Sequence, residues 1–420
     1  MKTIIKVLLM ALIVAVLSQC KKEPDPFVTI PDNNFLNALI KLGIDTDGDG
    51  IINHDEAAVV TYLDVSSDSI SDLKGIEAFI NLDTLKCFYN QLTNLDLSKN
   101  SSLKYLACEF NLLTNLDVSN NPDLTWLYCG YNSLTSLDVS KNPKVNWLWC
   151  WSNLLTSLDI SHNPKLKALR CSLNPLTSLN VSNNPKLNEL WCSGNSLTSL
   201  DVSHNPELNE LRCHDNSLTS LDVSNNYALS ILICIKNSLT SLDVSHNPDL
   251  TSLQFDYNSL TSLNVSNNPK LRWLSCYGSP LSILDVSSNP ALYELGCGKN
   301  SLTNLDVSNN PELSRFFCSG NSFTNLDVSN NPALTLLYCE DNLLTSLDIS
   351  HNPELLYLQC GGNLLTSLDL SKNIAINYLT IKSMPSLYKV CVWTMPFPPV
   401  GVEVDTTNSP NVYFTTDCSK

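Results

Sequence analysis

Positive charge is scarce in this chain. Its 420 residues include 25 Lys and Arg against 41 Asp and Glu, a formal net charge of −16 at pH 7. Nucleic-acid binding needs clustered basic side chains that neutralise phosphates, so we expect no nucleic-acid partner. Apolar runs are short as well, and residues 7–17 are too few to span a bilayer comfortably. No grouping of nucleophile, general base and oxyanion donors is recognisable, so we expect no enzymatic activity.

What the chain does contain is a repeat of 21 residues. The phrase Leu-Thr-Ser-Leu-Asp-Val-Ser-x-Asn-Pro occurs at 134–143, 197–206 and 344–353, and a looser phrase, Leu-x-x-Leu-x-Cys-x-x-Asn, lies between copies. Fourteen units cover residues 82–375 without insertion or deletion, and a partial fifteenth begins at Ile376. A fixed period in this range predicts a solenoid in which each turn stacks only on its neighbours.

Alternating apolar positions predict two short strands in each unit. Leu127 and Cys129 should point inward from the first strand, and Leu137 and Val139 from the second. We therefore predict a β-rich solenoid, with two parallel sheets around a narrow apolar core. The Asn that closes each half-unit is expected to satisfy backbone groups of the turns and to stack as a ladder.

Residues 1–20 are predicted to be a lipoprotein signal peptide, and 21–31 a linker. Lys2 and Lys6 precede the apolar run, and Cys20 ends it in a pattern that resembles a bacterial lipobox. The resemblance implies a lipid anchor on Cys20, which would be the protein's only membrane contact. The charged residues 21–23 resemble the surface-export tag of Bacteroidota lipoproteins, which implies the outer membrane. The alternative is a secreted protein without a lipidated Cys20.

Residues 32–81 are expected to form a small helical cap with a calcium loop. Residues 45–56 match the twelve-residue EF-hand pattern D-x-D-x-D-G-x-I-x-x-x-E. Ca²⁺ prefers six to eight oxygen ligands, and the expected ligands are Asp45, Asp47, Asp49, the Ile51 carbonyl, Asn53 and a bidentate Glu56. We predict one weakly bound Ca²⁺ that stiffens the junction with the first repeat. The alternative is an Asp/Gly-rich loop that holds no ion.

The repeat motif resembles leucine-rich repeats, specifically the bacterial nested class called IRREKO and, more broadly, internalin-like surface proteins. The resemblance covers residues 82–384. With the signal and the calcium loop, the chain also resembles flavobacterial surface lipoproteins. The resemblance implies a leucine-rich-repeat rod that binds other molecules at the cell surface.

Thirteen of the sixteen cysteines occupy one inward repeat position, from Cys87 to Cys360. Stacked strands place their Cβ atoms about 4.8 Å apart, whereas a disulfide needs about 3.8 Å. These cysteines are therefore predicted to be buried free thiols. Cys391 and Cys418 lie off the repeat, in residues 385–420, which we predict to be a C-terminal cap. In an exported protein these two are expected to form a disulfide.

The two outward faces differ in composition. The second strand repeats an Asp at nearly every turn (Asp96, Asp117, Asp138 and onward), and stacked carboxylates are expected to raise one another's pKa or to recruit cations. The first strand varies and is rich in aromatic residues, which dominate binding hot spots. The candidate ligand-binding residues are Tyr105, Trp126, Tyr128, Trp147, Trp149, Trp151, Trp191, Trp273 and Tyr277. A protein ligand and a role in adhesion are favoured. A glycan ligand is the alternative, and a purely structural envelope protein is a further one.

Overall fold

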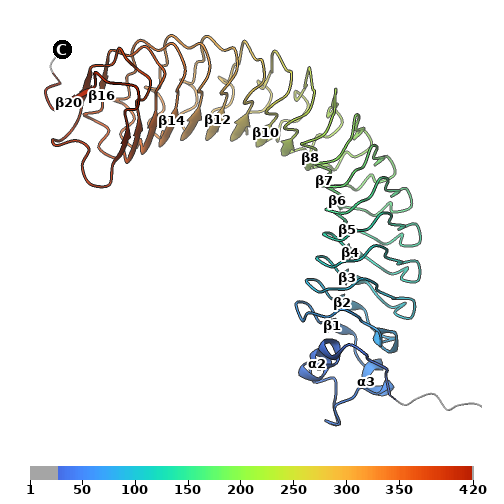
Figure 1. The fold of residues 1–420 in the computed structure, drawn as a ribbon. Coiled ribbons are helices and arrows are strands. Elements are labelled where there is room, and N and C mark those ends of the chain that lie inside the picture. The colour runs from blue at the N-terminus through green and yellow to red at the C-terminus, as the bar shows by residue number, and fades with distance from the viewer. Residues whose placement is uncertain (1–26, 419–420) are drawn as a thin grey trace, which may run out of the picture.

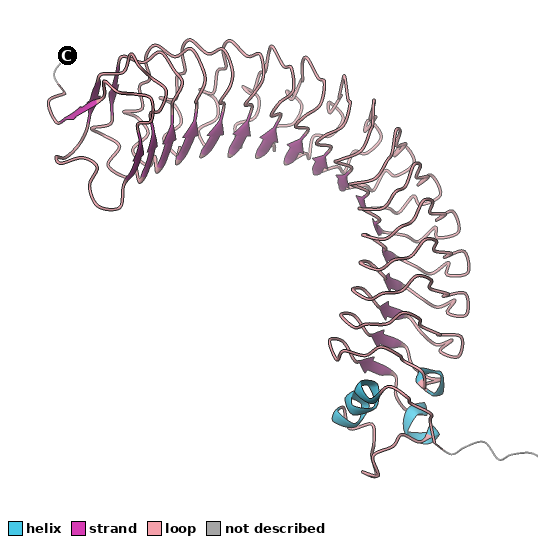
Figure 2. Cartoon of the chain, in the orientation of Figure 1, coloured by secondary structure: helices cyan, strands magenta, loops and turns pink. Residues whose placement is uncertain are grey.

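One parallel β-sheet runs the length of a curved rod. The computed structural model describes residues 27–418, and its sheet contains 17 strands of three residues each. The sheet lines the inner, concave side of the arc (Figures 1 and 2). Its strands are β1 (Tyr62–Asp64), β2 (Thr84–Lys86), β3 (Tyr105–Ala107), β4 (Trp126–Tyr128), β5 (Trp147–Trp149), β6 (Ala168–Arg170), β7 (Glu189–Trp191), β8 (Glu210–Arg212), β9 (Ile231–Ile233), β10 (Ser252–Gln254), β11 (Trp273–Ser275), β12 (Glu294–Gly296), β13 (Arg315–Phe317), β14 (Leu336–Tyr338), β15 (Tyr357–Gln359), β17 (Tyr378–Thr380) and β19 (Glu403–Asp405).

The sequence period sets the register of this sheet. Each residue from β2 to β15 pairs with the residue 21 positions further on, as Leu127 pairs with Leu148. The middle residue of each strand from β1 to β17 is buried, and so is the residue two positions later, which is a cysteine in most turns. Fully burying a Leu or Val side chain contributes about 1.5–3 kcal/mol, so the stacked columns form one long core. The predicted β-rich solenoid is confirmed.

The second strand predicted for each turn is mostly absent. Across the described repeats the convex segment is extended but hydrogen-bonds as a strand only at an isolated bridge between Asn264 and Asp285 and in a three-stranded sheet near the C-terminus. Because the rod is curved (Figure 1), the turns lie further apart on the outer side than on the inner side. Backbone groups about 4.8 Å apart can form a ladder, and this wider separation is consistent with the missing pairing on the outer side.

Asparagine side chains connect the turns on that outer side. Asn205 Nδ2 donates to the carbonyls of Val181 and Asn184, at 3.0 and 2.9 Å. On the other half of the turn, Asn132 donates to the carbonyls of Cys108 and Cys129, and its Oδ1 accepts from the backbone N–H of Leu113. The predicted ladders are therefore present, and they replace backbone pairing where the strands diverge.

The N-terminal cap contains two helices. Helix α2 (Asn33–Lys41) is capped by Asp32, whose Oδ1 accepts from the backbone of Asn34 and Phe35. The other carboxylate oxygen accepts from the backbone and hydroxyl of Ser71, which ties the helix to the first turn. Helix α3 (His54–Ala58) and the short 3-10 helix η1 (Ile76–Ala78) complete the cap. Strand β1 pairs with β2, so residues 61–80 form an irregular first turn.

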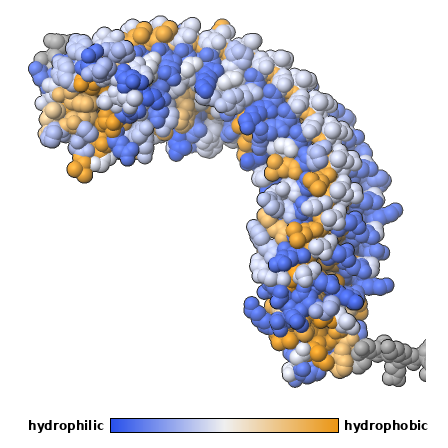
Figure 3. All heavy atoms as spheres, viewed as in Figure 1, coloured by the Kyte–Doolittle hydropathy of each residue, from blue (hydrophilic) through white to orange (hydrophobic). Residues whose placement is uncertain are grey.

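The C-terminal segment continues the solenoid after the motif is lost. Strand β19 pairs with β17 in the main sheet, while β16 (Ser367–Asp369), β18 (Lys389–Cys391) and β20 (Tyr413–Thr415) form the small convex sheet. The residues predicted to be only a cap thus add a further turn with longer loops. Trp393, Phe397 and Phe414 pack against the core at this end. Hydrophobic side chains also gather at both ends of the rod in Figure 3.

The cysteine column lies inside the core. The thirteen cysteines from Cys87 to Cys360 are free and buried in the described chain, and Phe255 takes the same position once without exposure. Burial raises the pKa of these thiols, for example to about 12 at Cys213. Within residues 27–418, no helix is both long and apolar enough to cross a membrane.

Candidate binding surface on the concave face

Three outward columns make up the aromatic surface. Tyr105, Trp126 and Trp147 begin their strands, and Tyr128, Trp149 and Trp191 end theirs. Strand registry places Tyr105 beside Trp126 and Tyr128 beside Trp149. The third column belongs to the turn after each strand. We call this set of side chains, together with those that contact it between β2 and β8, the aromatic face.

The rings of the aromatic face contact one another directly. Tyr128 and Trp149 stack with centroids 4.1 Å apart, and Tyr105 meets Tyr128 edge-on at 5.5 Å. In the turn column, Phe110 stacks on Tyr131 at 4.7 Å and meets Trp151 edge-on at 5.6 Å. Six of the predicted residues, Tyr105, Trp126, Tyr128, Trp147, Trp149 and Trp151, therefore lie together on β3, β4, β5 and the turn that follows β5.

Two arginines continue this stack, and the sequence interpretation did not include them. The Arg170 guanidinium carbon lies 4.1 Å from the Trp149 ring centroid and 3.7 Å from that of Trp191. Arg212 covers the other side of Trp191 at 4.5 Å. Each arginine also pairs with a carboxylate, Arg170 with Glu189. Reading residues at 21-residue intervals from Trp149 would have found this alternation of indole and guanidinium groups.

The turn column places aromatic residues on strained backbone. Tyr89, Phe110 and Tyr131 have φ of 52°, 55° and 54°, in the left-handed region. The same repeat position is left-handed along the rod, where it holds glycine in some turns, such as Gly194, and other residues in most, such as Lys236. A non-glycine residue in that conformation costs on the order of 1–3 kcal/mol. The left-handed turn is therefore a property of the repeat, and in these turns it presents the rings of Tyr89 and Tyr131 to solvent.

A hollow of about 400 Å³ opens within the aromatic face. Its lining includes Phe110, Trp149, Trp151, Arg170 and Trp191. The indole N–H groups of Trp149 and Trp191 are buried without an acceptor in the described chain. Unsatisfied buried donors are few in folded proteins, so these two groups are a local cost of the aromatic face.

Two predicted residues lie apart from this surface. Trp273 on β11 and Tyr277 in the turn after it are four strands beyond Trp191 on β7. Tyr277 contacts Tyr257 at 5.4 Å and Lys299 at 5.5 Å instead. The structure therefore divides the predicted residues into a main aromatic face and a smaller separate patch.

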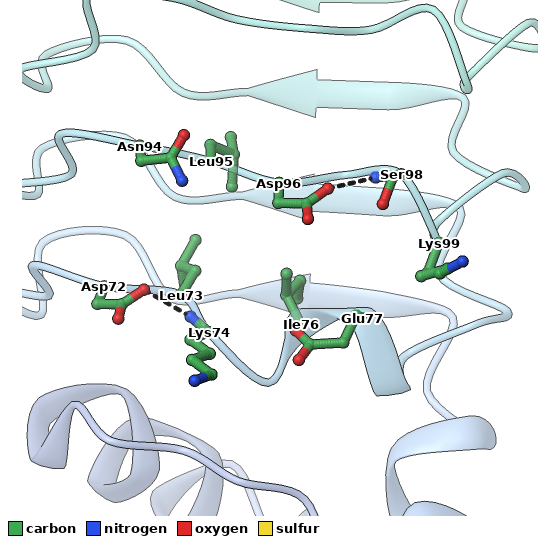
Figure 4. A pocket seen from close by; sticks show the side chains of 10 residues that line it. All are labelled: Asp72, Leu73, Lys74, Ile76, Glu77, Asn94, Leu95, Asp96, Ser98 and Lys99. Atoms are coloured by element: carbon green, nitrogen blue, oxygen red, sulfur yellow. Dashed lines mark hydrogen bonds between the residues drawn. The ribbon is translucent and has the colours of Figure 1, made fainter.

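The convex face carries the column of Asp side chains. Grooves of about 390 Å³ recur there, one beside Asp72 and Asp96 (Figure 4) and another beside Asp306 and Asp327. Asp96 accepts a hydrogen bond from the backbone N–H of Ser98 at 2.9 Å. That hydrogen bond and its equivalents lower the pKa of the column, so the expected upward shift is wrong. Each of these carboxylates has a local hydrogen-bond donor, which outweighs the repulsion between neighbours.

The predicted calcium loop brings part of its ligand set together. Carboxylate oxygens of Asp45, Asp47 and Asp49 lie within 4.8 Å of one another. Asp45 also accepts from the backbone N–H groups of Gly48 and Gly50, at 2.7 and 3.0 Å. Both glycines have positive φ, which permits the tight turn. The loop geometry thus fits a cation that prefers oxygen ligands.

The other two predicted side-chain ligands are used differently. Glu56 is buried, and its two oxygens accept from Thr46 and from the backbone N–H of Asn53. These hydrogen bonds hold the pKa of Glu56 below its usual value. The Asn53 side chain caps helix α3 by accepting from the backbone of Glu56 at 2.9 Å. Ile51, the predicted carbonyl ligand, follows Gly50 in the loop.

The remaining predicted residues are the three cysteines that lie off the repeat. Cys391 and Cys418 form a disulfide with Cα atoms 5.5 Å apart, which joins β18 to the chain end. Cys20 and the signal segment lie outside the described residues.

Comparisons with known proteins decide the family. The solved functional domain of InlJ from Listeria monocytogenes, which includes a cysteine ladder, is 38% identical with a TM-score of 0.72. The match covers 86% of this chain and 75% of that one. The chain belongs to the internalin-like leucine-rich-repeat proteins. This internalin-like chain has its own ladder, from Cys87 to Cys360.

Two further comparisons cover less of the known protein or show the fold alone. Curated Internalin J of Listeria monocytogenes serotype 4b (strain F2365) is 42% identical over 71 residues, which are 17% of this chain and 8% of Internalin J. The receptor kinase GASSHO1/SCHENGEN3 of Arabidopsis thaliana, solved with Casparian Strip Integrity Factor 2, shares 20% identity and a TM-score of 0.64. That match covers 79% of this internalin-like chain and 50% of the receptor, and it shows the fold alone. No protein-family model matches the chain.

Proposed function

We propose that this protein is an exported binding protein that captures a protein ligand on its aromatic face and acts in adhesion. The observation that carries the proposal is the joined stack of Tyr105, Tyr128, Trp149, Arg170 and Trp191 on the concave sheet. Trp, Tyr and Arg are the residues most enriched in binding hot spots. A uniform structural face would not need them.

One local cost supports a binding role over a purely stabilising one. The indole N–H groups of Trp149 and Trp191 are buried without an acceptor in the described chain. Sequences selected only for stability avoid buried donors without an acceptor. A protein ligand could supply backbone carbonyls near the indoles. The GASSHO1/SCHENGEN3 receptor, which has the same fold, was solved with a protein factor.

We further propose that the chain reaches the cell surface as a lipoprotein. The support is the sequence alone: the basic start, the apolar run, Cys20 and the charged residues 21–23. Two signals, a lipid and the export tag, would hold the binding rod at the outer membrane. Replacing Cys20 by Ser should abolish incorporation of labelled fatty acid and release the protein from the membrane fraction.

We also propose that the loop at 45–56 binds Ca²⁺. The three clustered carboxylates and the two positive-φ glycines support this proposal. When bound, Ca²⁺ would neutralise the repulsion among Asp45, Asp47 and Asp49. Glu56 would become a ligand by giving up the hydrogen bonds that it accepts from Thr46. Extracellular modules of this kind bind Ca²⁺ in the range of about 0.1–1 mM.

The main proposal is tested by capture from the organism's own surroundings. The immobilised protein is compared with a variant carrying Trp147→Ala, Trp149→Ala and Trp151→Ala, and with a convex control carrying Asp138→Ala, Asp159→Ala and Asp201→Ala. A protein retained by the wild type and the control, but lost from the tryptophan variant, supports the proposal. A polysaccharide with that behaviour would favour a glycan ligand. Equal retention by all three would leave the aromatic face a structural feature.

A further inference from the structure

A second hollow of about 280 Å³ lies beside the first on the aromatic face. It is lined by Phe88, Tyr89, Tyr105, Ala107, Glu109, Phe110, Tyr128 and Trp149. Six of these eight residues are aromatic. Tyr89 and Phe110 stack at 4.1 Å to form one wall, and Tyr105, Tyr128 and Trp149 form the other. We call this hollow the aromatic cage.

A small residue in a column of large ones creates the cage. Ala107 pairs with Tyr128 on one side and Lys86 on the other, and it is itself buried. Lys86 does not fill the space above Ala107. Its ammonium nitrogen lies 3.8 Å from Asp64 and 5.3 Å from the Tyr62 ring centroid, on the preceding turn. The cage therefore stays open to solvent.

Glu109 is the charged residue of the cage lining, and the structure gives it no cation. Its carboxylate is in none of the ion pairs of the described chain, and the interactions that shift its pKa include no Lys or Arg. Burial raises the pKa of Glu109. Arg170, which lines the neighbouring hollow, is held by Glu189 and by two indole rings. The carboxylate thus lines an aromatic enclosure without a cationic partner among the described residues.

We propose that the aromatic cage binds an alkylammonium group, supplied by a lysine side chain of the protein ligand. The faces of Tyr, Trp and Phe rings attract cations, and this attraction strengthens when the cation is removed from water. An unpaired carboxylate at the same place adds a charge-assisted hydrogen bond. The proposal rests on the proposed function, because it names the chemistry that this surface recognises in its ligand.

The size of the cage favours a single side chain. Pockets for small ligands commonly measure about 300–1,000 Å³, so 280 Å³ lies just under that range. A series of sugar rings would need a longer platform, and neutral sugars would leave Glu109 without a counter-charge. A lysine fits both features, because its four methylene groups pack against rings while its ammonium reaches the carboxylate.

The direct test titrates the full-length protein with Nα-acetyl-lysine amide, its uncharged isostere Nα-acetyl-norleucine amide, and choline, using calorimetry and tryptophan fluorescence. The lysine derivative is expected to bind about tenfold more tightly than the norleucine derivative. Glu109→Gln and Tyr128→Leu should each weaken lysine binding by about tenfold. Asp138→Asn, which removes a carboxylate from the convex face, should leave it unchanged. A thermal melt of each variant shows that it is folded.

Four outcomes would overturn the inference. Equal binding of the lysine and norleucine derivatives would exclude a cation site, and so would unchanged binding by the folded Glu109→Gln variant. Tighter binding of choline than of the lysine derivative would exclude lysine as the intended cation. A ligand captured equally by wild type and Glu109→Gln would refute the cage but not the proposed function. Lysine binding without any captured protein would support the cage but refute the proposed function.

Discussion

The guanidinium carbon of Arg170 lies 3.7 Å from the ring centroid of Trp191, on the adjacent strand. A second indole, Trp149, covers the opposite face of the guanidinium at 4.1 Å. The side chain also pairs with Glu189 while remaining only 24% exposed. Arg170 therefore holds three neighbouring groups in one arrangement, and the flat aromatic face depends on it.

Replacing Arg170 by Ala is expected to destabilise the protein by about 1–2 kcal/mol, because cation–π contacts and an ion pair are lost together. Arg170→Lys should recover only part of the lost stability, because an ammonium does not stack as a planar guanidinium does. Arg315→Ala, at a more exposed pair on β13, should change stability by less than about 0.5 kcal/mol. Urea denaturation of the three variants provides the measurement. Equal losses at Arg170 and Arg315 would contradict this account.

Replacing Asn205 by Ala is expected to cost about 1–3 kcal/mol, because two buried carbonyls on neighbouring turns lose their donor. Asn304 is an exposed convex residue, and its replacement by Ala should be nearly neutral. Chemical denaturation again distinguishes the two variants. If Asn205→Ala were as stable as Asn304→Ala, the ladder would not be what connects the outer sides of the turns.

The cysteine ladder should be chemically silent in the folded protein. Its thirteen thiols are buried and their pKa values are raised by desolvation, and only the thiolate reacts readily. Iodoacetamide should therefore leave residues Cys87 to Cys360 unmodified in buffer and alkylate them in denaturant, as mass spectrometry would show. Extensive labelling under native conditions would mean that the core opens far more often than a packed solenoid should.

Calcium removal should lower the melting temperature by several degrees, which corresponds to about 1–3 kcal/mol of linked binding energy. The effect should vanish in a variant carrying Asp45→Asn and Asp47→Asn. In the Asp96→Asn variant, which alters a convex carboxylate of the first repeat, calcium removal should lower the melting temperature as much as in the wild type. Melting curves with and without chelator test this directly. Identical curves for the wild type would refute a stabilising ion in the 45–56 loop.

Glu109→Gln is expected to raise stability at neutral pH. Burial raises the pKa of Glu109 above 4.5 in the folded protein, so the folded state binds the proton more tightly than the unfolded state. The free energy of unfolding therefore falls as the pH rises from about 4.5 through the folded pKa, and the full cost is present above it. The difference in the free energy of unfolding between variant and wild type should be largest near pH 7 and should disappear below about pH 4.5. A gap that is constant across this range would contradict the assignment.

The sequence predicted those features that depend only on the period. The inward positions of Leu127 and Cys129 and the Asn ladders follow from the spacing of the repeat. Curvature does not, because it arises from the difference between a hydrogen-bonded inner side and an outer side joined by side chains. The curvature accompanies the loss of the second sheet, whereas the pKa of Asp96 is lowered, rather than raised, by the hydrogen bond from the backbone N–H of Ser98.

The aromatic face was predicted residue by residue, but its continuation was not. Composition marked Trp149 and Trp191 and passed over Arg170, although all three share one repeat position. The further turn made by β19 was hidden for another reason. Tyr378 pairs with Glu403, 25 residues further on instead of 21, so the motif ends while the backbone pairing continues.

The curvature of the rod also restricts the shape of the proposed ligand. The aromatic face and the patch at Trp273 and Tyr277 both lie along the inside of one arc (Figure 1). A planar object, such as a bilayer or a crystalline polysaccharide wall, would rest on the two tips of that arc and leave its middle untouched. A rounded body can press against both patches at once, and a globular protein domain, the ligand proposed above, has that form.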